Sequence, residues 1–599
     1  MRYEPTLVAL AVASLAATSA RAVEIDTGNT DLQLRWDNTF KYSVATRLKA
    51  PSTVLTSDVN TDDGDFNFKK GSLILNRLDL LSEFDARYKS VGLRVSGAAW
   101  YDAVYNRGNS NPGANPPDAT PHPNQLSVPA NEFTEATKRL HGRKAELLDA
   151  FVFGKTEVGD MPLTGRLGKH TVLYGESLFF GMNGIAGAQT PIDVVKLLSV
   201  PNWTFKEVMM PVAQVSGQLQ IQRNVTLSAY YQFDWKRNRL PGAGSYFSQI
   251  DAFDAGGEQA IVGCPAGLAL PCSPASPPFA AGVFPTLLRG SDLEAKKSGQ
   301  GGTSLRWRPE GQNVEYGLYA ARFNSKDPIA YVSQYGAPPA LNFSTGVVGQ
   351  YQLVFPEGTK VLGASFSTSL GDVNVAGELS YRWDQALVPQ AGRVILPDGV
   401  TPSSNNQFAP LGQTLHAQVS WIALLSPGPL WDGGSFIGEI AWHRLQKVTA
   451  NGTYANGEVL HAAPALGGGP LNGVSKLDEN ATRQAAAIRF IFEPQYFQVV
   501  SGLDLSVPIG LGYGLFGRSP VINPGFSIYH GGDLSIGLKG DYLREWKVGL
   551  TYTKFIGKQA DGGVVSPANL PPVTGQQHFS YAQGLADRDY IAFTLQRTF

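Results

Sequence analysis

The sequence predicts an all-β chain that closes into a transmembrane, antiparallel barrel of about 18 strands, with roughly 16 to 20 as the range. Apolar and polar residues alternate along most of the chain, the strands marked in this way run for about 11 to 16 residues, and the links alternate between tight and long. Globular strands usually have about five or six residues, whereas a tilted strand needs about nine to eleven to cross hydrocarbon. This combination is typical of a bacterial outer-membrane barrel, with short periplasmic turns and long outer loops.

The first 22 residues, "MRYEPTLVALAVASLAATSARA", predict a signal peptide over residues 1–22. Arg2 forms a thin positive region, Leu7 to Leu15 form an apolar core, and Ala20-Arg21-Ala22 is a cleavage site of the A-x-A kind. A buried N-terminal helix is the alternative. We therefore expect a single barrel domain over residues 23–599.

Formal charges nearly cancel, with 49 Lys and Arg against 50 Asp and Glu in 599 residues. No long-range field then favours nucleic acid or an anionic surface as a partner. No apolar run of about 18 residues follows the N-terminal segment, so we expect no membrane-spanning helix.

The alternation is clear in "VNVAGELSYRWD", where alternate residues from Val373 to Trp383 form an apolar face and Glu378 and Arg382 lie opposite. Such segments predict half-buried strands. We place strands near residues 31–46, 71–87, 91–106, 143–155, 163–173, 209–222, 224–237, 299–309, 312–325, 357–370, 372–386, 412–424, 434–449, 482–493, 500–513, 529–541, 545–556 and 588–599.

The long links are rich in Pro, Gly, Asn and Ser, and the longest, residues 238–298, is expected to be an extracellular loop. It holds both cysteines, Cys264 and Cys272, with no nearby His that would complete a zinc site. In an oxidising compartment a local disulfide follows, and a pair of free thiols is the alternative.

One connection interrupts the strands with helical signals. Thr190 is expected to cap a short helix, Pro191 fits its first turn, and Pro201 ends it. A segment this apolar needs something to pack against, and the lumen of a large barrel is the sheltered volume available. We predict that residues 174–208 fold inward as a lumen insert that narrows the pore; a cap across the barrel mouth and an oligomer interface are the alternatives.

The residues expected at the constriction and along the solute path are Ile185, Thr190, Pro191, Ile192, Asp193, Val195, Lys196, Leu198, Trp203, Phe205, Lys206 and Glu207. The wall positions expected to face the lumen carry charges of both signs, at Arg35, Lys41, Arg94, Asp234, Glu378, Arg382, Asp384, Glu439, His443, Lys539 and Asp541. A ring of one sign would indicate an ion-selective pore. Mixed signs favour pairing across the lumen and anchoring of the insert.

The last strand, "DRDYIAFTLQRTF", resembles the C-terminal assembly signal of outer-membrane barrels, carried here by Phe593, Leu595 and the terminal Phe599. Arg597 departs from that pattern, which usually has an apolar or aromatic residue at this position.

The segment "GMNGIAGAQTPIDVVKLLSVPNWTFKEVMMPVAQVSGQLQ", with its "TPIDV" and its Lys206-Glu207 and Pro211-Val212 pairs, resembles a motif of a proteobacterial family known as domain of unknown function 1302. The resemblance implies an outer-membrane barrel that is often encoded with catabolic genes for steroids, aromatics or other hydrophobic compounds. It implies uptake or export of such molecules and assigns no catalytic residue. The family usually has Asn-Pro and an Arg-rich "Leu-Arg-Arg-Pro-Gly", and this chain has Thr190-Pro191 and "LLSVPN" instead.

We therefore expect a passive outer-membrane channel of a Gram-negative bacterium for small hydrophobic or amphipathic molecules, with no cofactor and no metal. Expected partners are membrane lipids, the barrel-assembly machinery and a periplasmic lipoprotein or inner-membrane transporter. An outer-membrane enzyme, a lipid-handling or export component, and a soluble secreted β-protein are the alternatives. No G-x-S-x-G, H-E-x-x-H or P-loop motif is present, and His170, His416 and His443 are expected to be polar lumen or loop groups.

Overall fold

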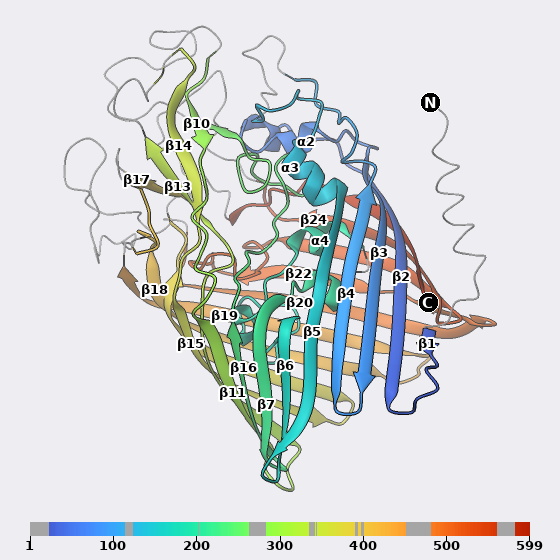
Figure 1. Cartoon of the computed structure of the whole chain (residues 1–599). Coiled ribbons are helices and arrows are strands. Elements are labelled where there is room, and N and C mark those ends of the chain that lie inside the picture. Colours follow the sequence, from blue (N-terminus) through green and yellow to red (C-terminus); the bar gives the residue numbers. More distant parts are fainter. Residues whose placement is uncertain are drawn as a thin grey trace.

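The computed structural model describes residues 23–113, 124–201, 203–262, 283–334, 342, 344–389, 393–396, 401–405, 407–450, 481–559 and 581–599. Within these residues the chain forms a closed antiparallel barrel of 18 strands with a short helical insert in its lumen (Figure 1). The predicted signal peptide and both cysteines lie outside the described residues, so those two predictions stay predictions.

The barrel strands are β2 (Leu32–Arg47), β3 (Leu73–Tyr88), β4 (Val91–Asp102), β5 (Arg143–Val158), β6 (Met161–His170), β7 (Val212–Gln222), β8 (Val225–Gln232), β11 (Gln300–Trp307), β12 (Val314–Phe323), β15 (Thr359–Leu370), β16 (Val373–Ala386), β18 (Leu411–Leu425), β19 (Gly433–Ala450), β20 (Gln484–Val500), β21 (Leu503–Ser506) with β22 (Ile509–Phe516), β23 (Gly532–Tyr542), β24 (Trp546–Ile556) and β25 (Tyr590–Thr598). β21 and β22 are two pieces of one strand, separated at Val507 and Pro508, and both pair with β20 and β23. A short strand β1 (Val23–Ile25) pairs only with β2. Each barrel strand pairs with its neighbour in the chain, and β25 closes the barrel on β2 from Thr39↔Thr598 to Arg47↔Tyr590.

Connections differ between the two ends of the barrel. Tight turns join β3 to β4, β5 to β6, β7 to β8 and β15 to β16, while connections of 15 or more residues gather at the other end (Figure 1). The predicted barrel, its strand number and its alternation of turns and loops are confirmed.

The long connections build a second, five-stranded sheet that the alternation did not predict. Its order is β17 (Arg393–Leu396), β13 (Ile329–Gln334), β14 (Val347–Val354), β10 (Thr286–Arg289) and β9 (Gln259–Ile261), with β10–β14 and β13–β17 parallel. Short helices lie at the same end: η1 (Leu55–Ser57), α2 (Asp63–Phe66), α3 (Glu135–Thr137) and η2 (Lys138–Gly142). The buried apolar clusters of the loops pack here, one of them around Phe68, Tyr105 and Tyr246.

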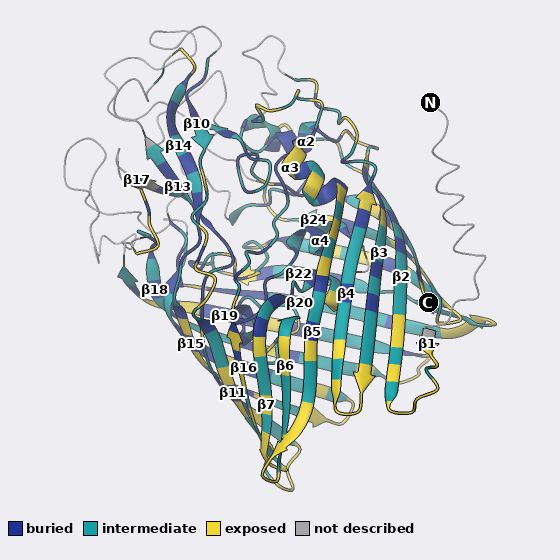
Figure 2. Cartoon of the chain, viewed as in Figure 1, coloured by how far each residue is buried: buried dark blue, intermediate teal, exposed yellow. Residues whose placement is uncertain are grey.

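Outer and inner faces alternate along each strand. Val419 on β18 and its cross-strand partner Ile440 on β19 are 46% and 41% exposed, whereas the next pair, Ser420 and Glu439, is buried. Figure 2 shows exposed residues recurring along the barrel strands and buried residues at the loop end. The exterior of the barrel is therefore apolar and the interior polar. None of the helices in the described part of the chain is long and apolar enough to cross a bilayer.

Candidate functional site

The insert occupies the connection between β6 and β7 and contains η3 (Ile185–Ala188), α4 (Val194–Ser199) and α5 (Phe205–Val208). α4 lies inside the barrel behind β4 and β5 in Figure 1. The N-cap of α4 differs from the prediction. Asp193, and not Thr190, caps the helix by accepting the N–H of Lys196 at 2.9 Å. Thr190 donates to the carbonyl of Val172 at 2.9 Å.

Residues 190–193 are not helical because they pair with other segments. Ile192 forms an antiparallel bridge with Met209. Its carbonyl accepts the N–H of Arg239 at 2.9 Å, and its own N–H donates to Asn238 Oδ1 at 2.8 Å. Pro191 is buried and its carbonyl accepts the N–H of Met210 at 2.9 Å. The second helix, α5, was not predicted; Glu207 accepts the N–H of Thr204 at 2.7 Å in a capping box.

Two acidic side chains of the barrel wall hold the first half of the insert. Glu439 on β19 accepts the main-chain N–H groups of residues 178–180 at 2.5 to 3.2 Å. Glu378 on β16 accepts the N–H of Ile185 at 2.9 Å and that of Glu176. Both carboxylates thus satisfy donors that an irregular buried segment would otherwise leave unpaired.

Arg382 and two histidines complete this attachment. Arg382 donates to the carbonyl oxygens of residues 182–184 at 2.8 to 3.1 Å. His443 and His416 place Nδ1 at 3.0 and 2.9 Å from Oδ1 of Asn183, which is fully buried. Asn183 is the centre of this network, and its glycine-rich neighbourhood carries no periodic signal that would have identified it.

His443 also places Nε2 at 3.0 Å from Oγ of Ser519. The same Oγ contacts both the N–H and the carbonyl of Val521, at 3.0 and 2.9 Å. His443 is fully buried and stacks on Phe526 at 4.7 Å between ring centroids. This chain of hydrogen bonds orients Asn183 and the insert.

Ion pairs hold the second half of the insert. Lys41 on β2, which is 2% exposed, pairs with Glu207 at 2.9 Å. Lys206 pairs with Glu83 on β3, which also binds Arg94 at 2.5 Å.

The start of α4 is held by a second group of charges. Asp193 pairs with Arg239, and Lys196 lies 3.4 Å from Glu146 on β5. The ammonium of Lys196 also lies 4.8 Å from the ring centre of Trp100, a cation–π distance. Trp100 and Glu146 were not among the predicted residues, although both lie on predicted strands.

The apolar residues of the insert divide into two groups. Ile185 and Val195 are buried, and Leu198 packs against the loop-end cluster around Phe68. Trp203 and Phe205 are 38% and 52% exposed. The first group therefore packs the insert against its surroundings, and the second presents apolar surface to open space.

The remaining predicted wall charges lie in different places. Arg35 is 64% exposed and pairs with Asp37, and Asp234 lies in the connection after β8. Asp384 differs most from the prediction. A bulge between Arg382 and Gln385, with a positive φ of 55° at Asp384, changes the alternation, and Asp384 pairs with the exposed Lys360 at 3.2 Å.

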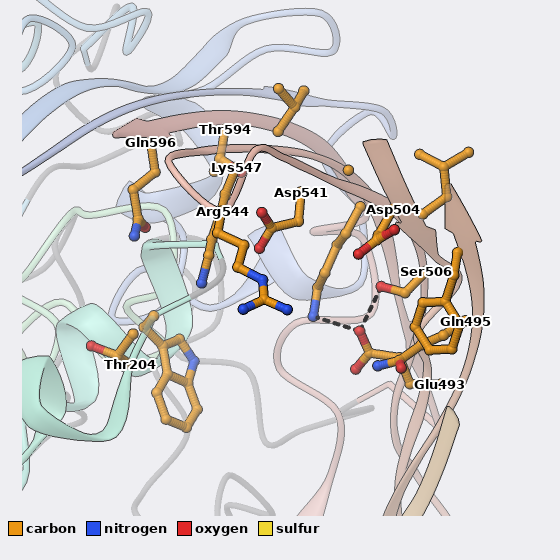
Figure 3. A pocket seen from close by; sticks show the side chains of 16 residues that line it. Thr204, Glu493, Gln495, Asp504, Ser506, Asp541, Arg544, Lys547, Thr594 and Gln596 are labelled. Carbon is orange, nitrogen blue, oxygen red and sulfur yellow. Dashed lines mark hydrogen bonds and ion pairs between the residues drawn. The ribbon is translucent and has the colours of Figure 1, made fainter. Parts of the chain in front are cut away.

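A cavity of about 630 Å³ lies between the insert and the wall of β20 to β25. Trp203 and Thr204 line it from the insert, and Figure 3 shows Arg544 and Lys547 pointing into it from the wall. The predicted lumen residues Lys539 and Asp541 line it as well, and Lys539 lies 3.5 Å from Glu493.

A second cavity, of about 310 Å³, lies at the loop end. Its walls are mainly apolar and include Ile250, Ile522 and Phe526. Phe526 stacks edge-on against Phe180 of the insert, with 5.4 Å between ring centroids. The insert therefore contacts the walls of both cavities.

The C-terminal residues predicted to form the assembly signal lie on β25 or at its end. Phe593 is partly exposed, and Leu595 pairs with Tyr42 and Val548. Phe599 stacks on Phe40 with 5.6 Å between ring centroids.

Solved structures that resemble this chain do so only distantly. OccAB4 of Acinetobacter baumannii has a TM-score of 0.39 and 7% identity, over 97% of this chain and 100% of that chain. OccK9 (OpdG) of Pseudomonas aeruginosa has a TM-score of 0.37 and 10% identity, over 95% and 98%. A BenF-like porin from Pseudomonas fluorescens Pf-5 has a TM-score of 0.36 and 8% identity, over 95% and 98%. These likenesses are too distant to identify a solute.

A search of curated proteins finds no match. The model of the family described as "Protein of unknown function (DUF1302)" matches residues 5–599. The resemblance noted in the sequence is thereby confirmed, and the chain belongs to the DUF1302 family.

Proposed function

We propose that the protein is a passive channel of a Gram-negative outer membrane, through which small amphipathic or hydrophobic molecules pass beside the insert. The observation that carries the proposal is a closed 18-strand barrel whose lumen the insert narrows without filling it, since a cavity of about 630 Å³ remains. A closed sheet of this size leaves a channel unless it is plugged.

The apolar exterior supports a membrane location. Leu362, Leu379, Val419 and Ile440 are each more than 40% exposed on neighbouring strands. A soluble protein rarely leaves so continuous an apolar surface in water. In the proposed setting these side chains contact lipid, and β25 with its terminal Phe599 is the segment that the assembly machinery recognises.

The two cavities support an amphipathic solute. The loop-end cavity offers apolar walls. The cavity beside Trp203 offers an aromatic side chain together with charges of both signs, with Arg544 and Lys547 among the cations and Glu493, Asp504 and Asp541 as the carboxylates. An aromatic or steroid-like body with one acidic group matches both surroundings. Such a compound would pass from the outer loops to the periplasm, where a lipoprotein or inner-membrane transporter would receive it.

Solute flux into liposomes tests the proposal. The purified barrel is expected to admit an aromatic carboxylate faster than a sugar of equal size, because only the former offers a ring for Trp203 and a negative charge for Arg544 and Lys547. Liposomes that contain heat-unfolded protein serve as the control. Absence of flux for every solute would contradict a channel, and equal rates for the two solutes would contradict the amphipathic preference.

A further inference from the structure

Three carboxylates meet at the loop end of the barrel, away from the insert. Asp62 and Asp63 lie at the start of α2 in the connection between β2 and β3, and Asp251 lies in the connection between β8 and β11. One oxygen of each carboxylate lies within 4.8 Å of one oxygen of the other two. All three side chains are buried, with Asp62 fully so.

Several oxygens of this cluster have no hydrogen-bond donor in the part of the chain that the structure describes. Both carboxylate oxygens of Asp62 and Oδ1 of Asp251 are in this state. Asp62 occupies the N-cap position of α2, where an aspartate usually accepts an N–H of the first turn, yet its side chain makes no capping bond. The carboxylate is turned into the cluster instead.

The arginines of this region neutralise other carboxylates. Arg47 pairs with Asp65 at 2.8 Å and with Asp587 at 3.0 Å, and Arg588 pairs with Asp65 at 2.7 Å. Among the described residues, no ion pair reaches Asp62, Asp63 or Asp251.

Three ionised carboxylates this close together repel one another unless a cation or bound protons compensate their charge. Buried charges in proteins are normally paired or bound to a metal.

We propose that Asp62, Asp63 and Asp251 form a calcium site that joins the outer loops. Calcium is a hard cation that takes six to eight oxygen ligands at about 2.3–2.6 Å, so ligand oxygens across one ion lie about 5.2 Å apart or closer, which the cluster satisfies. Softer metals such as zinc prefer nitrogen and sulfur ligands, which the three aspartates do not supply.

Neighbouring oxygens are suited to complete the coordination. Asn124 donates its main-chain N–H to Asp63 at 3.1 Å, and its own Oδ1 is buried without a donor among the described residues. Magnesium demands a smaller, near-ideal octahedron and retains its waters, so a buried site with carboxylate and amide oxygens favours calcium.

The site would hold together three loops that are far apart in the sequence. Asp62 and Asp63 belong to the first, Asn124 to the connection between β4 and β5, and Asp251 to the third. The Asp63 N–H already donates to Asp251 at 3.0 Å across 188 residues of sequence. That separation explains why the sequence pattern led us to expect no metal.

Calcium binding and thermal unfolding of the whole barrel in detergent test the site. Protein stripped with EDTA is expected to bind one Ca²⁺, with a dissociation constant of about 10⁻⁴ M or lower, and to unfold at a higher temperature once Ca²⁺ is restored. The double variant Asp62→Asn, Asp251→Asn is expected to fold, because it loses mutual repulsion, and to bind Ca²⁺ at least about 100-fold more weakly. Glu132→Gln, on an outer loop but paired with Lys138, is the matched control and is expected to behave as the unsubstituted protein.

Three results would overturn the proposal. The first is no calcium in the untreated protein by metal analysis and no binding up to about 10 mM Ca²⁺ after stripping. The second is equal affinity in the double variant, and the third is equal affinity for Mg²⁺. The first result would show that bound protons, and not a metal ion, neutralise the carboxylates. In that case the metal-free double variant would unfold at a higher temperature than the metal-free unsubstituted protein.

Discussion

Individual charged residues of the wall hold the insert. The sequence supplied the two signs and the inward positions, and from these we predicted pairing and anchoring. Lys41, Glu378, Arg382, Glu439 and His443 all contact the insert or its hydrogen-bond network. Their partners could not be predicted, because they are mostly main-chain groups of residues 176–185, whose positions depend on the folded segment.

Removing one partner of the Lys41–Glu207 pair is expected to loosen α5. Lys41→Met would leave the carboxylate of Glu207 without its ammonium partner, and loss of one member of a buried pair costs about 3–5 kcal/mol. The double variant Lys41→Met, Glu207→Gln is expected to restore most of the loss, because replacing both partners is close to neutral. Current noise in planar bilayers measures how far α5 is loosened. The temperature at which the barrel unfolds on gels measures the loss of stability.

Arg35→Ala is the matched control for this pair. Arg35 lies on the same strand as Lys41 but is 64% exposed in its pair with Asp37, and exposed pairs contribute about 0–1 kcal/mol. An effect of Lys41→Met no larger than that of Arg35→Ala would refute the anchoring role of Lys41.

At the scale of elements, the barrel strands were predictable and the loops were not. Period-two alternation over long segments places most strands within a few residues of their observed ends. The largest error is at β20, which was predicted to end at residue 493 and continues to Val500. The interruption between β21 and β22 was missed because the alternation continues across Val507 and Pro508. The loop sheet was missed because its strands are short and its parallel pairs join distant segments, such as β10 with β14.

Prediction of the insert was partly correct for a physical reason. A capping pattern and two prolines indicate a helix near residues 190–201, but Asp193 and Thr190 are both acceptable caps in isolation. The bridge between Ile192 and Met209 decides between them, and such a tertiary pairing leaves no local signal.

The element that borders the open cavity is the segment before α5, and Trp203 is its largest side chain there. Trp203→Ala is expected to raise single-channel conductance, because it removes an indole that lines the cavity, while the unfolding temperature changes little since Trp203 is 38% exposed. Trp307→Ala is the control, because Trp307 is 46% exposed on β11, whose outer face points away from the lumen. Conductance that is equal in the Trp203 variant and in the unsubstituted protein would contradict the assignment of Trp203 to the solute path.

At the scale of the whole molecule, the polar inner wall, the apolar exterior and the anchored insert each have a separate part in the proposed channel. The exterior fits lipid, the wall charges are used to hold the insert, and the two cavities on the insert differ in chemistry. Strand number and closure followed from the sequence. The cavities did not, because their walls combine residues from the insert, the barrel strands and the loops.

Single-channel conductance in planar bilayers tests whether the insert narrows the pore. The comparison is between the unsubstituted barrel and a variant in which residues 186–204 are replaced by a short Gly-Ser linker, with the heat-dependent shift on gels confirming that both barrels are assembled. We predict a several-fold larger conductance and weaker discrimination between an aromatic carboxylate and a sugar in the variant. Equal conductance in two assembled barrels would contradict it.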